Sequence, residues 1–322
     1  MRFTDSFPMI EEARATGRGH RFWLEIPKFI LVFIVMSFVM QLICGLIEGF
    51  ILRITQVDET TGMLIMLYEE IIGLVLVLLY CALAERRPLS SMGFVKKGAV
   101  IQYLKGIGIG FVLFSAVVLL GTLMGGFTFE GVYGHIQPGI LLMFFVGFLF
   151  QGMFEEATDR GYFMVSLSRK NPVLAGVLVN SALFALSHGF NPGFGLFPAV
   201  NLLLFGLFAS VYMLRTGNIW GVGAIHSVWN FVQGNFFGLS VSGMPLMPSV
   251  FVFGTTDNAL ISGGDFGPEG GLPVTIVLAV GIALVLLVPK KRGAERVHCQ
   301  RLSPADQGGG LRHPLSHGLF RE

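Results

Sequence analysis

The sequence predicts an all-α, polytopic membrane protein, a helix bundle with about eight transmembrane helices. Composition is the first reason for this prediction. Hydrophobic residues make up 53% of the 322 residues and charged residues only 13%, and the mean hydropathy is +0.71. Soluble domains carry roughly 25% charged residues, so we expect the lipid bilayer to be the main solvent and the first partner of the chain. We expect no nucleic-acid partner.

The length of the apolar segments is the second reason, because about 20 apolar residues cross one hydrocarbon core. Eight segments approach or exceed this length, at residues 29–50, 63–84, 104–124, 139–167, 172–189, 196–214, 218–238 and 272–289. The sequence therefore predicts an N-terminal segment over 1–28 and one helical domain over 29–289. The polar, Gly-containing tail over 290–322 is predicted to be disordered.

The distribution of basic residues is the third reason. If all eight segments cross the membrane, 20 of the 22 Lys and Arg residues lie on one side. The loops on the other side, residues 125–138, 190–195 and 239–271, contain no Lys or Arg. Basic loops stay on the cytoplasmic side of a membrane, so we expect a multi-pass protein of the cell membrane with both termini in the cytoplasm.

Charged side chains inside the apolar segments are the main functional signal, because each costs about 2.5–3.5 kcal/mol at the bilayer centre on insertion scales. The densest cluster includes Glu155, Glu156 and Arg160. Glu156 and Arg160 are four residues apart, so on a helix they share a face and can pair, whereas Glu155 points elsewhere. The alternative is a helix end that reaches the headgroups, but an apolar run resumes after Gly161.

Two histidines also lie inside apolar segments. His188 follows Phe184 by four residues, and His226 precedes Asn230 by four residues, so each pair shares a helix face. Taken alone, His188 is also compatible with a histidine at the membrane interface. Likewise, His226 and Asn230 are compatible with a hydrogen-bonding pair that joins two helices.

These side chains are predicted at comparable depths in the membrane. At about 1.5 Å per helical residue, the predicted distances from the cytoplasmic face are roughly 18 Å for Glu155, 24 Å for His188, 12 Å for His226 and 18 Å for Asn230. Three helices are thus able to present a carboxylate, two imidazoles and an amide to one pocket.

Such a set of groups suits hydrolysis of an amide bond, which needs an activated water and donors for the oxyanion. Glu155 and His188 could polarise the water, and His226 and Asn230 could donate to the oxyanion. Alternatively, Glu155, His188 and His226 could bind Zn²⁺, with water in a fourth position. The sequence contains no HExxH and no GxSxG, and its cysteines have no metal or redox spacing.

The three motifs together resemble the CPBP family, the CAAX-protease and bacteriocin-processing proteins, also called the ABI family. Its pattern is EExxxR, then FxxxH, then HxxxN on successive intramembrane helices, and here it covers about residues 139–238. The matching residues are, in order, Glu155, Glu156 and Arg160; Phe184 and His188; and His226 and Asn230.

This resemblance implies an eight-helix, CAAX-protease-like fold with a cavity open toward the cytoplasm. It implies that Glu155 activates water with the help of His188. It also implies that His226 and Asn230 stabilise the oxyanion and that Glu156 and Arg160 organise the site. The family resemblance leaves the metal dependence open.

We therefore predict an intramembrane endopeptidase, glutamate-dependent or metal-dependent, that hydrolyses peptide bonds of membrane-associated proteins or peptides. One alternative is a non-catalytic immunity or scaffold protein of the same fold. Another is a proton-coupled transporter, for which intramembrane Glu and His are equally natural. The transporter hypothesis would use Glu69 and Glu70, which the protease hypothesis leaves unexplained.

Overall fold

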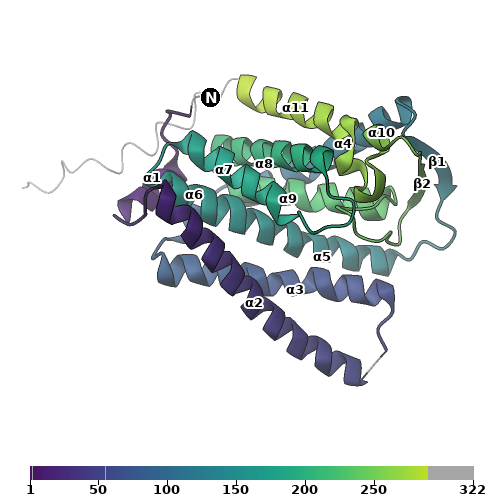
Figure 1. The fold of residues 1–322 in the computed structure, drawn as a ribbon, viewed down its shortest axis with the longest axis horizontal. Helices are drawn as coiled ribbons and strands as arrows, with labels where there is room; N and C mark the ends of the chain where they lie inside the picture. Colours follow the sequence, from purple (N-terminus) through teal and green to yellow (C-terminus); the bar gives the residue numbers. More distant parts are fainter. Residues whose placement is uncertain (2, 55, 289–322) are drawn as a thin grey trace, which may run out of the picture. The chain divides into compact units, whose positions relative to one another are not determined.

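Helices occupy all eight predicted apolar segments in the computed structural model of the chain, which describes residues 1, 3–54 and 56–288 (Figure 1). The predicted tail over 290–322 lies outside the described residues. The eight helices are α2 (Phe22–Ile54), α3 (Glu59–Leu79), α4 (Ala99–Leu123), α5 (Pro138–Glu156), α7 (Val173–Ser187), α8 (Leu196–Thr216), α9 (Ile219–Phe231) and α11 (Leu272–Leu287). The predicted class, an all-α polytopic membrane bundle, is confirmed.

Helical turns with π geometry extend three of these helices. The segment η1 (Tyr80–Ala84) follows α3, and η4 (Val232–Phe236) follows α9. The longest, η3 (Ala157–Met164), follows α5 and leads into the short helix α6 (Val165–Ser168). Single π-helical turns inside α-helices are frequent at functional sites, and two of the three here adjoin the predicted motifs.

Five helical segments in the described part of the chain are long and apolar enough to cross a membrane. They are Phe22–Ile54, Glu59–Ala84, Ala99–Leu123, Pro138–Ser168 and Leu196–Thr216. The apolar helices α7 and α11 are shorter, at 15 and 16 residues. At about 1.5 Å per residue, α7 spans roughly 22 Å, less than the ~30 Å hydrocarbon core. The number of eight crossings stays a prediction.

The motif-bearing helices lie at the centre of the bundle. Helix α5 packs between α3 and α9, α9 also packs against α4, and α7 packs against α8 (Figure 1). Small residues allow these close approaches, as is common in membrane helix pairs. A Cβ on Gly106 of α4 would lie 2.3 Å from the carbonyl oxygen of Gly221, and a Cβ on Gly152 of α5 would lie 2.5 Å from Oγ of Ser227.

The N-terminal segment contains a helix that the sequence analysis missed. Helix α1 (Pro8–Ala15) buries Met9, Ile10 and Ala13 and packs against α6 and the 3₁₀ turn η2 (Leu89–Met92). Its three apolar residues sit among charged neighbours, so average polarity hides them. Part of the predicted N-terminal segment over 1–28 therefore packs on the bundle.

Basic residues from three segments meet at this end of the bundle. Arg14 donates from Nη2 to the carbonyl oxygen of Ser168 at 3.0 Å, and Lys28 donates from Nζ to Glu85 at 2.8 Å. Arg169 also pairs with Glu85. Burial alone would raise the pKa of the Glu85 carboxyl, but its contacts with Lys28 and Arg169 outweigh burial and hold that pKa below its usual range.

Two of the loops without Lys or Arg meet at the other end. Strand β1 (Phe127–Val132) pairs antiparallel with β2 (Phe251–Thr255), and helix α10 (Ala259–Ser262) lies beside them, at the opposite end from α1 and α6 (Figure 1). This small sheet is not among the elements predicted from the sequence. The basic segments thus gather at one end of the bundle and the loops without basic residues at the other, which agrees with the alternation in the sequence.

The contact between α4 and α9 gives a stability prediction. In Gly106→Ala the new methyl group would lie 2.3 Å from the Gly221 carbonyl oxygen and 2.7 Å from Cβ of Ala224. We expect overpacking to cost roughly 1–3 kcal/mol, measured as a lower melting temperature in detergent. Gly108→Ala is the matched control, because a Cβ on Gly108 of the same helix meets nothing within 4 Å. Equal melting temperatures for the two variants would contradict close packing here.

Candidate active site

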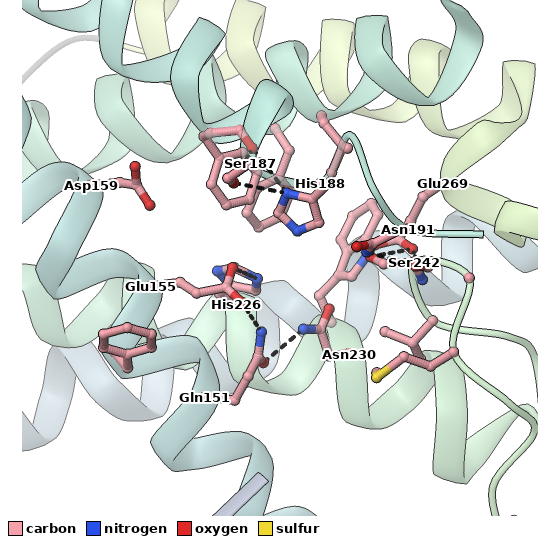
Figure 2. Close-up of a pocket in the computed structure, with 18 of the residues that line it drawn as sticks. Gln151, Glu155, Asp159, Ser187, His188, Asn191, His226, Asn230, Ser242 and Glu269 are labelled. Atoms are coloured by element: carbon pink, nitrogen blue, oxygen red, sulfur yellow. Dashed lines mark hydrogen bonds and ion pairs between the residues drawn. The ribbon is translucent and has the colours of Figure 1, made fainter. Parts of the chain in front are cut away.

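A cavity of about 510 Å³ lies between the motif-bearing helices. Side chains from α2, α3, α5, α7, α8, α9 and α11 line it, together with loop residues that follow α7 and η4 (Figure 2). Its polar lining residues are Glu70, Gln151, Glu155, Thr158, Asp159, Ser187, His188, Asn191, Asn201, His226, Asn230, Ser242 and Glu269. Four of the six predicted site residues are therefore in the lining, and Glu156 and Arg160 lie behind it.

Glu156 and Arg160 form a fully buried ion pair. Arg160 donates from Nη1 to Oε1 of Glu156 at 3.0 Å, and both side chains are 0% exposed. The same oxygen accepts from Nδ1 of His226 at 2.9 Å. Arg160 also lies over the ring of Phe184, 4.5 Å from its centroid. The pairing predicted from the four-residue spacing is present, even though Arg160 lies in the π-helical segment η3.

Glu155 lines the cavity, and one of its two carboxylate oxygens is hydrogen-bonded. Its Oε1 accepts from Nε2 of Gln151, one helical turn earlier. Gln151 in turn accepts from Nδ2 of Asn230 through its own Oε1 at 2.9 Å. Oε2 of Glu155 is buried without a hydrogen-bond partner and lies 3.6 Å from Nε2 of His226. Figure 2 shows Glu155, Gln151, His226 and Asn230 grouped on one wall of the cavity.

His188 lies across the cavity from this group (Figure 2). It caps the end of α7, and its Nδ1 lies 2.9 Å from the carbonyl oxygen of Phe184. A carbonyl oxygen can only accept, so Nδ1 carries the proton in this contact, and in the neutral imidazole Nε2 then has the lone pair. Among the described side chains His188 makes no direct hydrogen bond with Glu155, so any joint action needs a water or substrate atom between them.

The adjacent glutamates therefore have different environments. Glu156 lies behind the cavity wall, where its Oε1 pairs with Arg160 and His226 and its Oε2 is buried without a partner. Oε2 of Glu155 also has no partner, but Glu155 lines the cavity. Sequence reasoning missed Gln151, whose only signal is its position four residues before Glu155. Of the two glutamates left unexplained, Glu70 lines the cavity and Glu69 does not.

The predicted zinc ligands do not form a metal-binding set in this geometry. Within residues 1, 3–54 and 56–288, no group of three or more His, Cys, Asp or Glu side chains is arranged to hold a metal ion. His188 lies across the cavity from Glu155 and His226. The residues present therefore do not fit Zn²⁺ bound by Glu155, His188 and His226.

The fold and this cavity define a polytopic membrane protein with hydrolase-type groups in an intramembrane pocket. A family model described as Type II CAAX prenyl endopeptidase Rce1-like matches residues 137–232. The matched segment carries all three motifs, and the match supports the resemblance of the chain to the CPBP, or CAAX-protease, family. The match thus supports an intramembrane protease at the family level. Comparisons with curated proteins and with solved structures give no match.

The buried ion pair gives a second stability prediction. Glu156→Gln leaves Arg160 charged and without its carboxylate partner at 0% exposure. Breaking a buried pair from one side costs about 3–5 kcal/mol, so we expect a clear fall in melting temperature in detergent. Glu48→Gln is the control, since Glu48 is an exposed glutamate in the apolar helix α2.

A double variant tests the cause of that effect. Replacing both partners, as in Glu156→Gln with Arg160→Met, removes the uncompensated charge, and such replacements are often neutral relative to the intact pair. We expect part of the lost melting temperature to return. A double variant that melts below Glu156→Gln alone would argue that Arg160 stabilises the fold through other contacts.

Proposed function

We propose that the chain is an endopeptidase that cleaves peptide bonds of membrane-associated proteins or peptides, with Glu155 as the base. The observation that carries the proposal is the free Oε2 of Glu155, buried in the cavity wall 3.6 Å from Nε2 of His226. A buried carboxylate oxygen without a partner is costly, and a bound water would satisfy it. Gln151 holds the other oxygen, so Oε2 is the atom that takes the water proton.

In the proposed reaction, the water oxygen attacks the carbonyl carbon of the substrate while its proton passes to Oε2 of Glu155. His188, with the lone pair of Nε2 available, assists by accepting a hydrogen bond from the same water. The electron pair of the carbonyl bond moves onto the oxygen, which accepts hydrogen bonds from Nε2 of a protonated His226 and from Nδ2 of Asn230. Preorganised donors of this kind are usually a large part of catalysis.

The tetrahedral intermediate then collapses. The C–N bond breaks, and the proton held by Glu155 passes to the leaving amine nitrogen, which restores the carboxylate. Glu156 and Arg160 act as positioning residues, since neither lines the cavity and Glu156 orients His226 through Nδ1. The family description names a prenyl endopeptidase. For this chain we propose membrane-associated substrates without requiring a prenyl group.

We also propose that the chain resides in the cell membrane with both termini in the cytoplasm. The support is the bias of Lys and Arg toward one set of loops and the meeting of basic segments at one end of the bundle. Residues 29–289 would then form one intramembrane protease domain, with the motif core at 139–238.

Removal of the base tests the proposal. Purified Glu155→Ala and Glu155→Gln are expected to lose at least about 10²-fold in cleavage of a quenched peptide library, in line with the usual contribution of a general base. Both variants should remain inserted, with a melting temperature close to the parent. Glu69→Gln is the matched control, because Glu69 is an intramembrane glutamate outside the cavity lining. Full activity in Glu155→Gln would refute the assignment of the base.

A chelator separates the two mechanistic classes. Because the donor geometry does not fit Zn²⁺, we expect purified protein to keep its activity after treatment with a strong chelator and buffer exchange. Loss of activity that added Zn²⁺ restores would instead support the zinc alternative. Absence of cleavage in the untreated protein and in every variant would favour the non-catalytic alternative.

A further inference from the structure

Ser242, in the loop that follows η4, has a strained backbone where it lines the cavity. Its φ is 49°, a left-handed conformation that residues other than Gly rarely adopt. Such residues persist only where their surroundings hold them, and they cluster at functional sites. Glu269 supplies the contacts here, since its Oε2 accepts hydrogen bonds from the backbone N–H of Ser242 and, at 2.9 Å, from the hydroxyl.

Glu269 is itself held by three other elements of the bundle. Its carbonyl oxygen accepts from Nδ2 of Asn201 in α8 at 2.7 Å, and Oδ1 of Asn201 accepts from the hydroxyl of Thr275 in α11 at 2.6 Å. Its Oε2 also accepts from Nε2 of Gln233 in η4 at 3.1 Å. Glu269 is 8% exposed, and the donors recorded for its carboxylate in the described chain, Ser242 and Gln233, are uncharged. The carboxylate is therefore a fixed acceptor for Ser242.

Hydrogen bonds continue from Ser242 to the turn after α7. The carbonyl oxygen of Ser242 accepts from Nδ2 of Asn191 at 2.9 Å. Asn191 in turn donates its backbone N–H to the carbonyl oxygen of His188 at 3.0 Å. A path of hydrogen bonds thus runs from Glu269 through Ser242 and Asn191 to the backbone of His188, and the side chains of all four residues line the cavity (Figure 2).

His188 needs support of this kind because it is the C-cap of α7. Helix ends open more easily than helix centres, and opening here would break the contact of Nδ1 with the carbonyl oxygen of Phe184. Packing between the two loops adds to the hydrogen bonds. A Cβ on Gly243 would lie 2.3 Å from the carbonyl oxygen of Pro192, so the turn after His188 has little room to move in that direction.

We propose that Glu269 is a positioning residue for His188 and acts through Ser242 and Asn191. Supporting contacts that lock a reactive group before substrate binds are a general requirement of catalytic sites. Ser242 and Glu269 lie outside the matched residues 137–232, so the family match does not assign them this role. The inference rests on the proposed function for its effect on cleavage, but the support of the His188 turn does not depend on that function.

Replacement of Glu269 tests the effect on cleavage. We expect Glu269→Ala to lower kcat on a single quenched peptide by up to about 10²-fold, because a misplacement of ~1 Å at a catalytic group can cost that much. KM should change less than kcat. Glu269→Gln should recover most of the loss, since its amide oxygen can accept from the same uncharged donors. Asn258→Ala is the control within the same loop, because Asn258 is exposed and lies outside the cavity lining.

Asn191→Ala tests whether the effect passes through the hydrogen-bond path, and it serves also where Glu269→Ala does not fold. We expect Asn191→Ala to lower kcat as well. Adding it to Glu269→Ala should cause little further loss, because residues of one network are not additive. Additive losses, a rise in KM at unchanged kcat, or equal losses in Glu269→Gln and Glu269→Ala would overturn the proposal.

Hydrogen exchange separates this inference from the proposed function. In Glu269→Ala we expect faster amide exchange over residues 188–194, with unchanged exchange in α4. Unchanged exchange at 188–194 would overturn the inference whatever the activity, and equal acceleration in α4 would overturn it by showing a general stabilising role. Faster exchange confined to 188–194, in a protein whose parent form cleaves no peptide, would refute the proposed function and leave the support of the His188 turn intact.

Discussion

The buried contact of Glu156 with Arg160 and His226 is the interaction on which the rest of the site depends. Two charges at 0% exposure inside an apolar bundle are tolerated only when they satisfy each other. Glu156 meets that requirement with Arg160 on its own helical segment and with His226 on α9. Arg160 also lies over Phe184 of α7. One ion pair therefore fixes three helices, and each of them carries one of the three motifs.

Glu155 and Glu156 are adjacent and chemically identical, but their different contacts give them different roles. The carboxylate of Glu156 lies outside the cavity lining, and its Oε1 accepts hydrogen bonds from Arg160 and from His226. Oε1 of Glu155 accepts a hydrogen bond from Gln151, and Oε2 has no hydrogen-bond partner. A single glutamate at this point of the helix could either hold the helices together or present a free oxygen to the cavity, but not both. The EE pair allows both.

Local patterns predicted the parts of this structure that depend on local physics. Hydropathy gave the eight helices, and four-residue spacing gave the Glu156–Arg160 pair, because both follow from helix geometry. Gln151 was missed because an uncharged amide in an apolar run has no burial cost large enough to attract notice. Asn191 and Ser242 were missed for another reason. They are 51 positions apart, and only the tertiary fold brings their loops together.

Glu155 and His188 owe their positions to different parts of the chain. Glu155 is held by Gln151, one turn earlier on its own helix. His188 ends α7, and the turn that follows it is joined to Ser242 in a loop outside the matched residues 137–232. The motifs therefore provide the reactive groups but not all of their support. A relative with the same three motifs and a different loop after α9 would need another support for the histidine at the end of α7, so activity has to be argued for each chain from its loops as well as from its motifs.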